Sequence, residues 1–304
     1  MKRILICTKI VVIAALALLL SCDDNNSTIE EQVTKVTYPI GGDVFIREGI
    51  LTIEWTDDVS SHVRIKLYKG NTRILSITES TENTGKYTWL IPDSLENGND
   101  YRIKIFSNTD DFIFYQSNEF KILGKAGVSV YVDPRDNQSY KIVKIGNQWW
   151  FAENFNYKTS SGSWVYDNNE SNSNDWGRLY DLQTAVSACP NGWQLPSDED
   201  WKTLELFIGL KTTDINRDGP RGRYEGILLM ENGGLDFNIK FGGFFNYFNA
   251  SFFNSWVEAN FWSSTKYYSY SAWSRKFNYG YGTITRTRVN LENGLSVRYC
   301  KYEF

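Results

Sequence analysis

The feature that most constrains the fold is a series of short segments, between residues 36 and 123, in which apolar and polar residues alternate. Turn sequences such as Lys69-Gly70-Asn71 separate these segments. Strict alternation is typical of half-buried β-strands, and about seven such strands in about 90 residues favour a two-sheet antiparallel sandwich. The predicted strands are 51–55, 63–68, 74–77, 87–91, 101–106 and 117–122.

Several stretches of this region resemble the immunoglobulin-like (Ig-like) module at the N-terminus of Kre9/KNH-type cell-wall proteins. The stretches are Tyr38–Gly42, Thr52–Trp55, Gly85–Trp89, Ile91–Pro92 and Gly98–Ile103. The resemblance implies an Ig-like β-sandwich over 36–123. We expect Trp55 and Trp89 to lie in its core, and stacking on a ligand is the alternative.

Residues 1–22 have the pattern of a bacterial lipoprotein signal peptide. Positive charge at Lys2 and Arg3 precedes the apolar run Ile10–Leu20, which is shorter than the about 20 residues that a membrane-spanning helix needs. Leu19-Leu20-Ser21-Cys22 resembles the lipobox, in which the cysteine is diacylated and becomes the new N-terminus. Cys22 is therefore the predicted lipid-attachment residue and membrane anchor, with an ordinary secretory signal as the alternative.

Residues 23–35 form a predicted polar tether, because they are too polar to bury a core. The tract from Asp23 to Ser27 resembles export signals that carry lipoproteins to the outer face of the outer membrane in Bacteroidota-type bacteria. The expected location is thus the outer membrane, facing the cell exterior. The net charge of −4 and the lack of a Lys/Arg cluster argue against a nucleic-acid partner.

Gly124 and Gly127 interrupt the strand pattern, and 124–128 is the predicted linker to a second domain at 129–304. Five stretches in order characterise this domain: Ile145–Tyr157, Gly177–Tyr180, Ser187–Trp201, Phe261–Thr265 and Gly294–Cys300. They resemble the Fibrobacter succinogenes major paralogous domain of bacterial lipoproteins and cell-surface proteins. The resemblance implies an α+β C-type-lectin-like fold with two helices, a small twisted sheet and long irregular loops.

Two helices are also predicted from the residues themselves. Ser197 is expected to N-cap the second helix, with Asp200 completing a capping box, so its acids need no catalytic role. The apolar face of the first helix, over 180–188, comprises Leu182, Ala185 and Val186. The apolar stripe of the second comprises Trp201, Leu204 and Phe207 or Ile208.

Cys189 and Cys300 are the two cysteines outside the N-terminal signal and anchor. A single pair in an exported protein favours a disulfide. The lectin-like resemblance implies the same bridge, because in that fold a disulfide joins the first helix to the last strand. The sequence has no CxxC motif for redox work, and two cysteines cannot complete a zinc site.

The segment from Asp214 to Glu225 matches the EF-hand pattern of acidic and amide residues around a glycine. A solvated loop is the favoured alternative, because Pro220 and Arg221 stand where a hydrophobic strand residue is expected. No cofactor is otherwise expected, and the triplets EPN, QPD and WND of lectin calcium sites are missing. The candidate calcium ligands are Asp214, Asn216, Asp218 and Glu225.

Two stretches, Phe241–Trp256 and Lys266–Arg288, interleave aromatic residues with Gly, Ser and Asn. This mixture is typical of recognition loops, and the lectin-like resemblance places the ligand-binding face in the same region. The alternative is that every second aromatic residue lines the sheet core. The candidate ligand-binding residues are Tyr267, Tyr268, Tyr270, Trp273, Tyr279 and Tyr281.

The sequence thus predicts a surface-exposed lipoprotein that acts as a non-catalytic binding or adhesion protein for a glycan or a surface or matrix protein. A structural cell-envelope component without a soluble ligand is one alternative. A glycan-active enzyme is another, which would need paired carboxylates in a cleft. Formylglycine-generating enzymes share the broad fold but need cysteine-based copper chemistry, which the expected disulfide would not supply.

Overall fold

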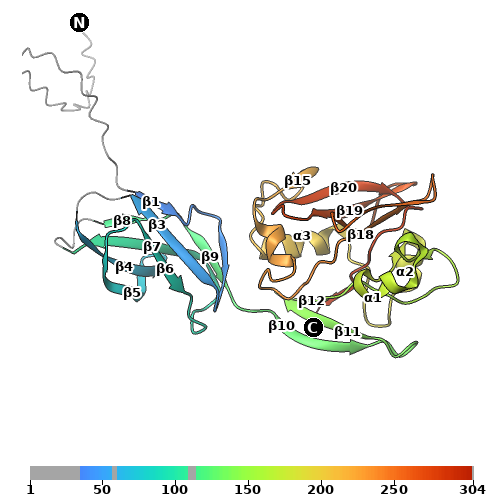
Figure 1. Cartoon of the computed structure of the whole chain (residues 1–304), viewed down its shortest axis with the longest axis horizontal. Helices are drawn as coiled ribbons and strands as arrows, with labels where there is room; N and C mark the ends of the chain where they lie inside the picture. The colour runs from blue at the N-terminus through green and yellow to red at the C-terminus, as the bar shows by residue number, and fades with distance from the viewer. Residues whose placement is uncertain (1–34, 57–59, 109–113, 303–304) are drawn as a thin grey trace, which may run out of the picture. The chain divides into compact units, whose positions relative to one another are not determined.

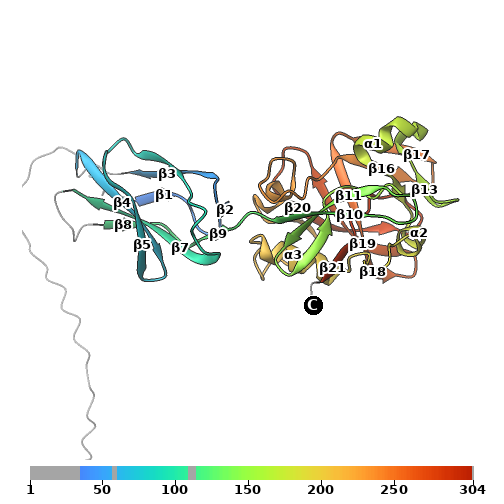
Figure 2. The ribbon, with the colours of Figure 1, turned by 90° about the horizontal axis from the view of Figure 1, so that it is seen from below.

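The computed structural model describes residues 35–56, 60–108 and 114–302. These residues form two regions with separate sheets, one over 35–123 and one over 127–302 (Figures 1 and 2). None of the helices in the described ranges combines the length and apolar character that crossing a bilayer requires. The predictions for the signal peptide, for Cys22 and for the tether up to residue 34 lie outside the described residues.

The first region is a β-rich, two-sheet sandwich, as predicted, and its strands pair antiparallel except that β2 and β9 run parallel. One sheet has the order β1-β3-β6, and the other has the order β2-β9-β7-β4-β5 with β8 beside β7. Trp55 and Trp89 are buried between the sheets, which confirms the prediction that they belong to the core. The strands are β1 (Lys35–Tyr38), β2 (Val44–Ile46), β3 (Ile50–Thr56), β4 (His62–Lys69), β5 (Thr72–Glu82), β6 (Lys86–Leu90), β7 (Gly98–Ser107), β8 (Phe114–Gln116) and β9 (Phe120–Leu123).

The second region contains a four-stranded antiparallel sheet of order β10-β11-β12-β21. Its first strand begins at Gly127, inside the predicted linker, because residues 127–132 pair in unbroken register with β11. Its last strand pairs with β12, so the two ends of the region meet in one sheet. The strands are β10 (Gly127–Val132), β11 (Ser139–Ile145), β12 (Gln148–Phe151) and β21 (Cys300–Tyr302).

A six-stranded sheet of order β15-β20-β19-β18-β16-β17 forms the other half of this region. Its strands are antiparallel except that β16 and β18 run parallel. The strands are β15 (Gly219–Arg221), β16 (Gly242–Asn246), β17 (Ser251–Ser255), β18 (Glu258–Tyr268), β19 (Ser271–Asn278) and β20 (Ile284–Asn290). A small sheet pairs β13 (Ser163–Trp164) with β14 (Leu179–Tyr180).

Helices α2 (Leu182–Ser187) and α3 (Asp198–Phe207) both contact β18, and a short α1 (Ser173–Trp176) precedes them (Figures 1 and 2). The predicted capping box is present at the start of α3, where Ser197 and Asp200 bond each other's backbone N–H. The prediction that Val186 lies on the buried face of α2 is wrong, since its exposed fraction is 51%. The helix is so short that Leu182 and Ala185 alone complete its buried face.

Candidate functional site

The aromatic residues of the predicted motifs build two separate cores on the two faces of β18. Phe261 belongs to the core that contains Trp150 and Trp201, whereas its neighbour Trp262 belongs to the core around Tyr180. The Trp262 indole N–H donates to the Tyr180 carbonyl at 2.6 Å, and the Trp201 indole N–H donates to the Trp262 carbonyl at 3.1 Å. These motif residues therefore determine the fold, and a ligand-binding surface must be sought elsewhere.

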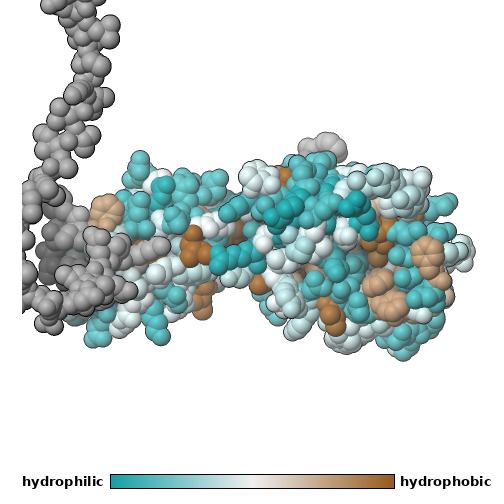
Figure 3. All heavy atoms as spheres, turned by 90° about the horizontal axis from the view of Figure 1, so that it is seen from above, coloured by the Kyte–Doolittle hydropathy of each residue, from teal (hydrophilic) through white to brown (hydrophobic). Residues whose placement is uncertain are grey.

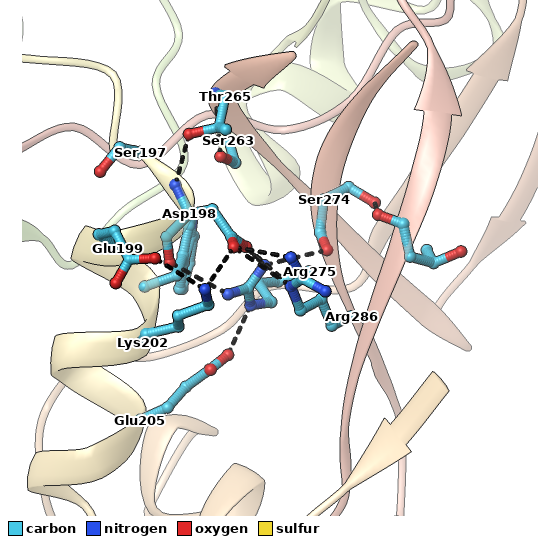
Figure 4. A network of polar contacts seen from close by, with 12 residues as sticks. Ser197, Asp198, Glu199, Lys202, Glu205, Ser263, Thr265, Ser274, Arg275 and Arg286 are labelled. Atoms are coloured by element: carbon cyan, nitrogen blue, oxygen red, sulfur yellow. Dashed lines mark hydrogen bonds and ion pairs between the residues drawn. The ribbon is translucent and has the colours of Figure 1, made fainter. Parts of the chain in front are cut away.

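A buried cluster of charged side chains joins α3 to the six-stranded sheet (Figure 4). The Asp198 carboxylate accepts hydrogen bonds from Arg275 on β19 and Arg286 on β20, each at 2.8 Å, and pairs with Lys202 at 3.0 Å. Burial on its own would raise the pKa of the Asp198 carboxyl. The hydrogen bonds from Arg286 and the charge of Arg275 outweigh that effect, so the pKa lies well below its ordinary value.

Glu205, two turns further along α3, holds the second half of this cluster. Its Oε1 atom accepts from Arg275 at 2.5 Å and from Arg221 of β15 at 2.8 Å. All three side chains are fully buried. The Glu205 Oε2 and Arg221 Nε atoms are buried without a hydrogen-bond partner. Because it is closed to solvent and its carboxylates are bound by arginines, we interpret the cluster as a structural link.

Arg298, in the last sequence motif, is a buried guanidinium that is satisfied by neutral acceptors. It donates to the carbonyls of Phe151 at 3.0 Å, Phe237 at 2.7 Å and Asn238 at 2.8 Å, and to the Asn154 side chain at 2.8 Å. Burial lowers the pKa of Arg298 to about 9. Its bonds tie the last motif to the Asn154 motif, so this arginine also serves the fold.

The structure does not build the predicted calcium site. The Asp218 carboxylate is bound by Arg286 at 2.8 Å and by Arg288 at 2.7 Å, and Asp214 pairs with Arg217 at 3.5 Å. Within the described ranges, His, Cys, Asp and Glu residues nowhere gather as a group of three that could hold a metal ion.

The other two predicted calcium ligands also have different roles. Glu225 accepts the Tyr224 backbone N–H at 3.0 Å at the start of a 3-10 helix, and the Asn216 carbonyl accepts from Arg286 at 3.2 Å. Strand β15 occupies the middle of the expected loop. The calcium prediction for Asp214, Asn216, Asp218 and Glu225 is therefore wrong.

Cys189 and Cys300, the predicted disulfide, are free thiols in the structure. Cys189 follows α2, and its thiol donates to the Pro190 carbonyl at 3.6 Å. Burial raises the pKa of the Cys189 thiol to about 12 and that of the Cys300 thiol well above its ordinary value. As free thiols, both therefore carry little thiolate near neutral pH.

The predicted ligand-binding aromatics separate into two groups at opposite ends of β19. Tyr267, Tyr268 and Tyr270 surround the β18–β19 hairpin turn, and we call these three residues the tyrosine tip. Tyr279 and Tyr281 lie beyond the other end of β19 and are also exposed. The strand between the groups is eight residues long, about 27 Å, so the two groups cannot contact one small ligand together.

The tyrosine tip is an exposed and ordered aromatic surface. Tyr268 and Tyr270 are 54% and 63% exposed, and their rings stack at 5.8 Å with an interplanar angle of 24°. Tyr267 packs edge-on against both Tyr268, at 4.3 Å, and Trp273, at 5.0 Å. Rigid aromatic rings of this kind provide large contact areas at little cost in side-chain entropy.

Trp273 supports the tip from below and is not itself a surface residue. Its exposed fraction is 7%, so Trp273 does not present its ring to a ligand. It follows the alternative given for these aromatics, in which every second one is buried against the sheet. The Arg286 guanidinium lies 3.3 Å from the centre of the Trp273 ring, and Arg288 lies 4.5 Å from that of Tyr267. The buried charge cluster therefore extends, through Arg286, to the underside of the tip.

Three exposed aromatic residues in Phe241–Trp256 were not among the candidate residues, although the composition of that stretch had indicated a recognition loop. Tyr247 and Phe248 occupy the β16–β17 turn, and Trp256 follows β17 and packs edge-on against Trp176 at 5.1 Å. On the face drawn in Figure 3, residues of high hydropathy are scattered among hydrophilic ones. The exposed aromatic residues of this stretch therefore lie in two places, at the β16–β17 turn and directly after β17.

The fold and the site define a β-rich protein in which an Ig-like sandwich precedes a region of sheets and short helices with an aromatic surface. The chain belongs to the Fibrobacter succinogenes major domain family, whose model matches residues 143–301. A model of the Kre9/KNH-like N-terminal Ig-like domain matches residues 39–122. Both matches confirm the resemblances found in the sequence. No curated protein matches the chain.

The substitution Glu205→Gln is expected to lower the free energy of unfolding by about 3–5 kcal/mol, because Arg221 and Arg275 would stay buried without a carboxylate. Urea unfolding followed by tryptophan fluorescence measures the change. Adding Arg221→Met should recover part of the loss by removing one uncompensated charge. The interpretation would be contradicted if the double variant lost as much free energy of unfolding as the two single variants lose together.

Asp198 is expected to make stability depend on pH in the acid range. Because its folded pKa lies below the ordinary value, the carboxylate stabilises the native state fully above about pH 4 and progressively less as the pH falls. Asp198→Asn should thus be less stable than wild type at pH 7, and the difference should shrink toward pH 3. Glu199→Gln, an exposed acid on the same helix, is the matched control and should change little at either pH.

Cys189 and Cys300 are expected to react slowly with a maleimide in the folded full chain at pH 7, since little thiolate is present. In urea both should react rapidly, and peptide mapping under non-reducing conditions assigns the label. Alkylation after prior reduction is the control. If the two cysteines stay unlabelled in urea and become labelled only after reduction, they form the disulfide predicted from the sequence.

Proposed function

We propose that this chain is a surface-exposed, lipid-anchored binding or adhesion protein that recognises a glycan through the tyrosine tip and catalyses no reaction. The observation that carries the proposal is the ordered, mutually packed set of exposed rings of Tyr267, Tyr268 and Tyr270. Exposed apolar ring area is unfavourable in water, and ligand stacking removes it. The C–H faces of sugar rings fit such surfaces because an aromatic face carries partial negative charge.

A C-type-lectin-like fold for 129–304 is part of this proposal. Three features support it: the pairing of the last strand with β12, the two helices α2 and α3, and the long segments between the strands. The tyrosine tip lies in the later part of the region, where lectin-like folds carry their ligand-binding face. A protein ligand of the cell surface or matrix would use the same aromatic surface.

The proposed location rests on the sequence of the N-terminus and on the two domain families. Acylation of Cys22 would anchor the chain, and more than one acyl chain would make the attachment stable. The tether to residue 35 would allow the folded regions to extend from the outer membrane toward the exterior. A non-catalytic role is supported by Asp198 and Glu205, whose carboxylates are bound by arginines.

The full chain should bind members of an array of neutral and acidic oligosaccharides, and Tyr268→Ala and Tyr270→Ala should each weaken that binding about tenfold, because a stacked aromatic contact contributes about 1–2 kcal/mol. Titration calorimetry on array positives measures the change. Tyr281→Ala, equally exposed but beyond the other end of β19, is the matched control and should retain wild-type affinity. Equal losses in all three variants, or a blank array, would contradict the proposal.

A further inference from the structure

A groove crosses α2 in the second region. It consists of two adjoining hollows, one of about 870 Å³ and one of about 690 Å³. Ser161, Asp181, Gln183 and Ser187 line both hollows, so the two adjoin at the helix. We call this feature the α2 groove. Each hollow has the volume of a complete small-molecule site, which is about 300–1,000 Å³.

The loop beside α2 is held in a defined position. Gly162 has a φ of 71°, and a Cβ atom at this position would lie 2.0 Å from Thr184 Oγ1, so the loop rests directly on the helix. Asp181 caps α2 by accepting the Thr184 N–H at 2.7 Å, and it also lines both hollows. The groove is thus formed by two segments locked together before any ligand binds.

Aromatic residues also line the groove, two in the larger hollow and one in the smaller. In the larger hollow, Trp164 stacks on Phe245 at 4.4 Å, and Tyr247 is half exposed. In the smaller one, the Tyr157 ring is covered by the Arg135 guanidinium at 4.2 Å. Aromatic surface on which a sugar ring could stack is therefore concentrated in the larger hollow, whereas the Tyr157 ring is already covered.

The polar lining of the α2 groove fits a neutral ligand rich in hydroxyl groups. Lys266 and the Gln183 amide are donors, whereas the Asp181 and Glu292 carboxylates are acceptors, so the larger hollow offers both kinds of group beside its aromatic rings. The positive charges of the smaller hollow are balanced locally, since Arg135 pairs with Asp133 at 2.6 Å and Lys158 pairs with Glu170 at 3.1 Å. An anionic ligand would meet two carboxylates in the larger hollow and is disfavoured.

The groove leads to the tyrosine tip. Lys266 in its wall directly precedes Tyr267, and the N–H of Leu291, another wall residue, donates to the Tyr270 carbonyl at 3.1 Å. We propose that the α2 groove binds a linear neutral oligosaccharide whose chain continues onto the tyrosine tip. The inference rests on the proposed glycan recognition and adds its ligand class: an extended, uncharged chain of several sugars.

The test measures how the affinity of the full chain for β-1,4-linked and β-1,3-linked glucose, mannose and xylose oligomers changes with length, from disaccharide to hexasaccharide. Calorimetry should show affinity rising at least tenfold over the series. Gln183→Trp, which fills the shared part of the groove from an exposed helix position, should abolish this rise while leaving disaccharide binding at the tip. Gln183→Ala, a smaller change that is less able to disturb folding, should reduce the rise in affinity. Circular dichroism checks that both variants are folded.

Three outcomes would overturn the inference: affinity independent of chain length, a Gln183→Trp variant that keeps the full rise, or stronger binding of uronic-acid oligomers or peptides in the groove. If Tyr268→Ala still weakens binding in those cases, the proposed function stands and the groove proposal alone fails. If no oligomer binds wild type and Tyr268→Ala has no effect on any array positive, both fail.

Discussion

Two carboxylates on one face of α3 determine how the helix and the six-stranded sheet are oriented. Asp198 and Glu205 together bind arginines from β15, β19 and β20. Buried ion pairs contribute little net stability because desolvation offsets their attraction, and this cluster even leaves polar atoms unpaired. Its effect is therefore one of specificity: three strands can meet the helix in a single arrangement. Since Arg286 also stacks on Trp273, that arrangement sets the position of the exposed tyrosines.

Features that depend on neighbouring residues could be predicted from the sequence. Alternation predicted the strands of the sandwich, and the spacing of Ser197 and Asp200 predicted the capping box. Features that depend on distant residues could not. The partners of Asp198 lie 77 and 88 positions away in the chain, so local reasoning found only a helix-capping role for these acids. The EF-hand match failed for the same reason, because Arg286 and Arg288 bind the Asp218 carboxylate.

The candidate site shows the same limit. Composition indicated aromatic recognition loops, but it could not separate the exposed Tyr268 from the buried Trp273, whose burial depends on Arg286 and Tyr267 above it. The α2 groove was not predicted at all. Trp164 and Tyr247 are far apart in the chain and line one hollow only after both cores have formed. The motif residues that identify the family build those cores. Most of the surface residues that would select a ligand lie outside the motifs.

The pairing of β21 with β12 has a consequence for how the second region forms during synthesis. The side-chain amide of Gln148, at the start of β12, donates a hydrogen bond to the hydroxyl of Tyr302, which lies 154 residues further along the chain. The sheet therefore cannot close until residues 300–302 are available, and until then β12 has an unpaired edge. Such long-range closure slows folding and leaves apolar surface open to other chains. The edge of β12 is therefore the part of the second region that stays open to pairing with other chains for longest.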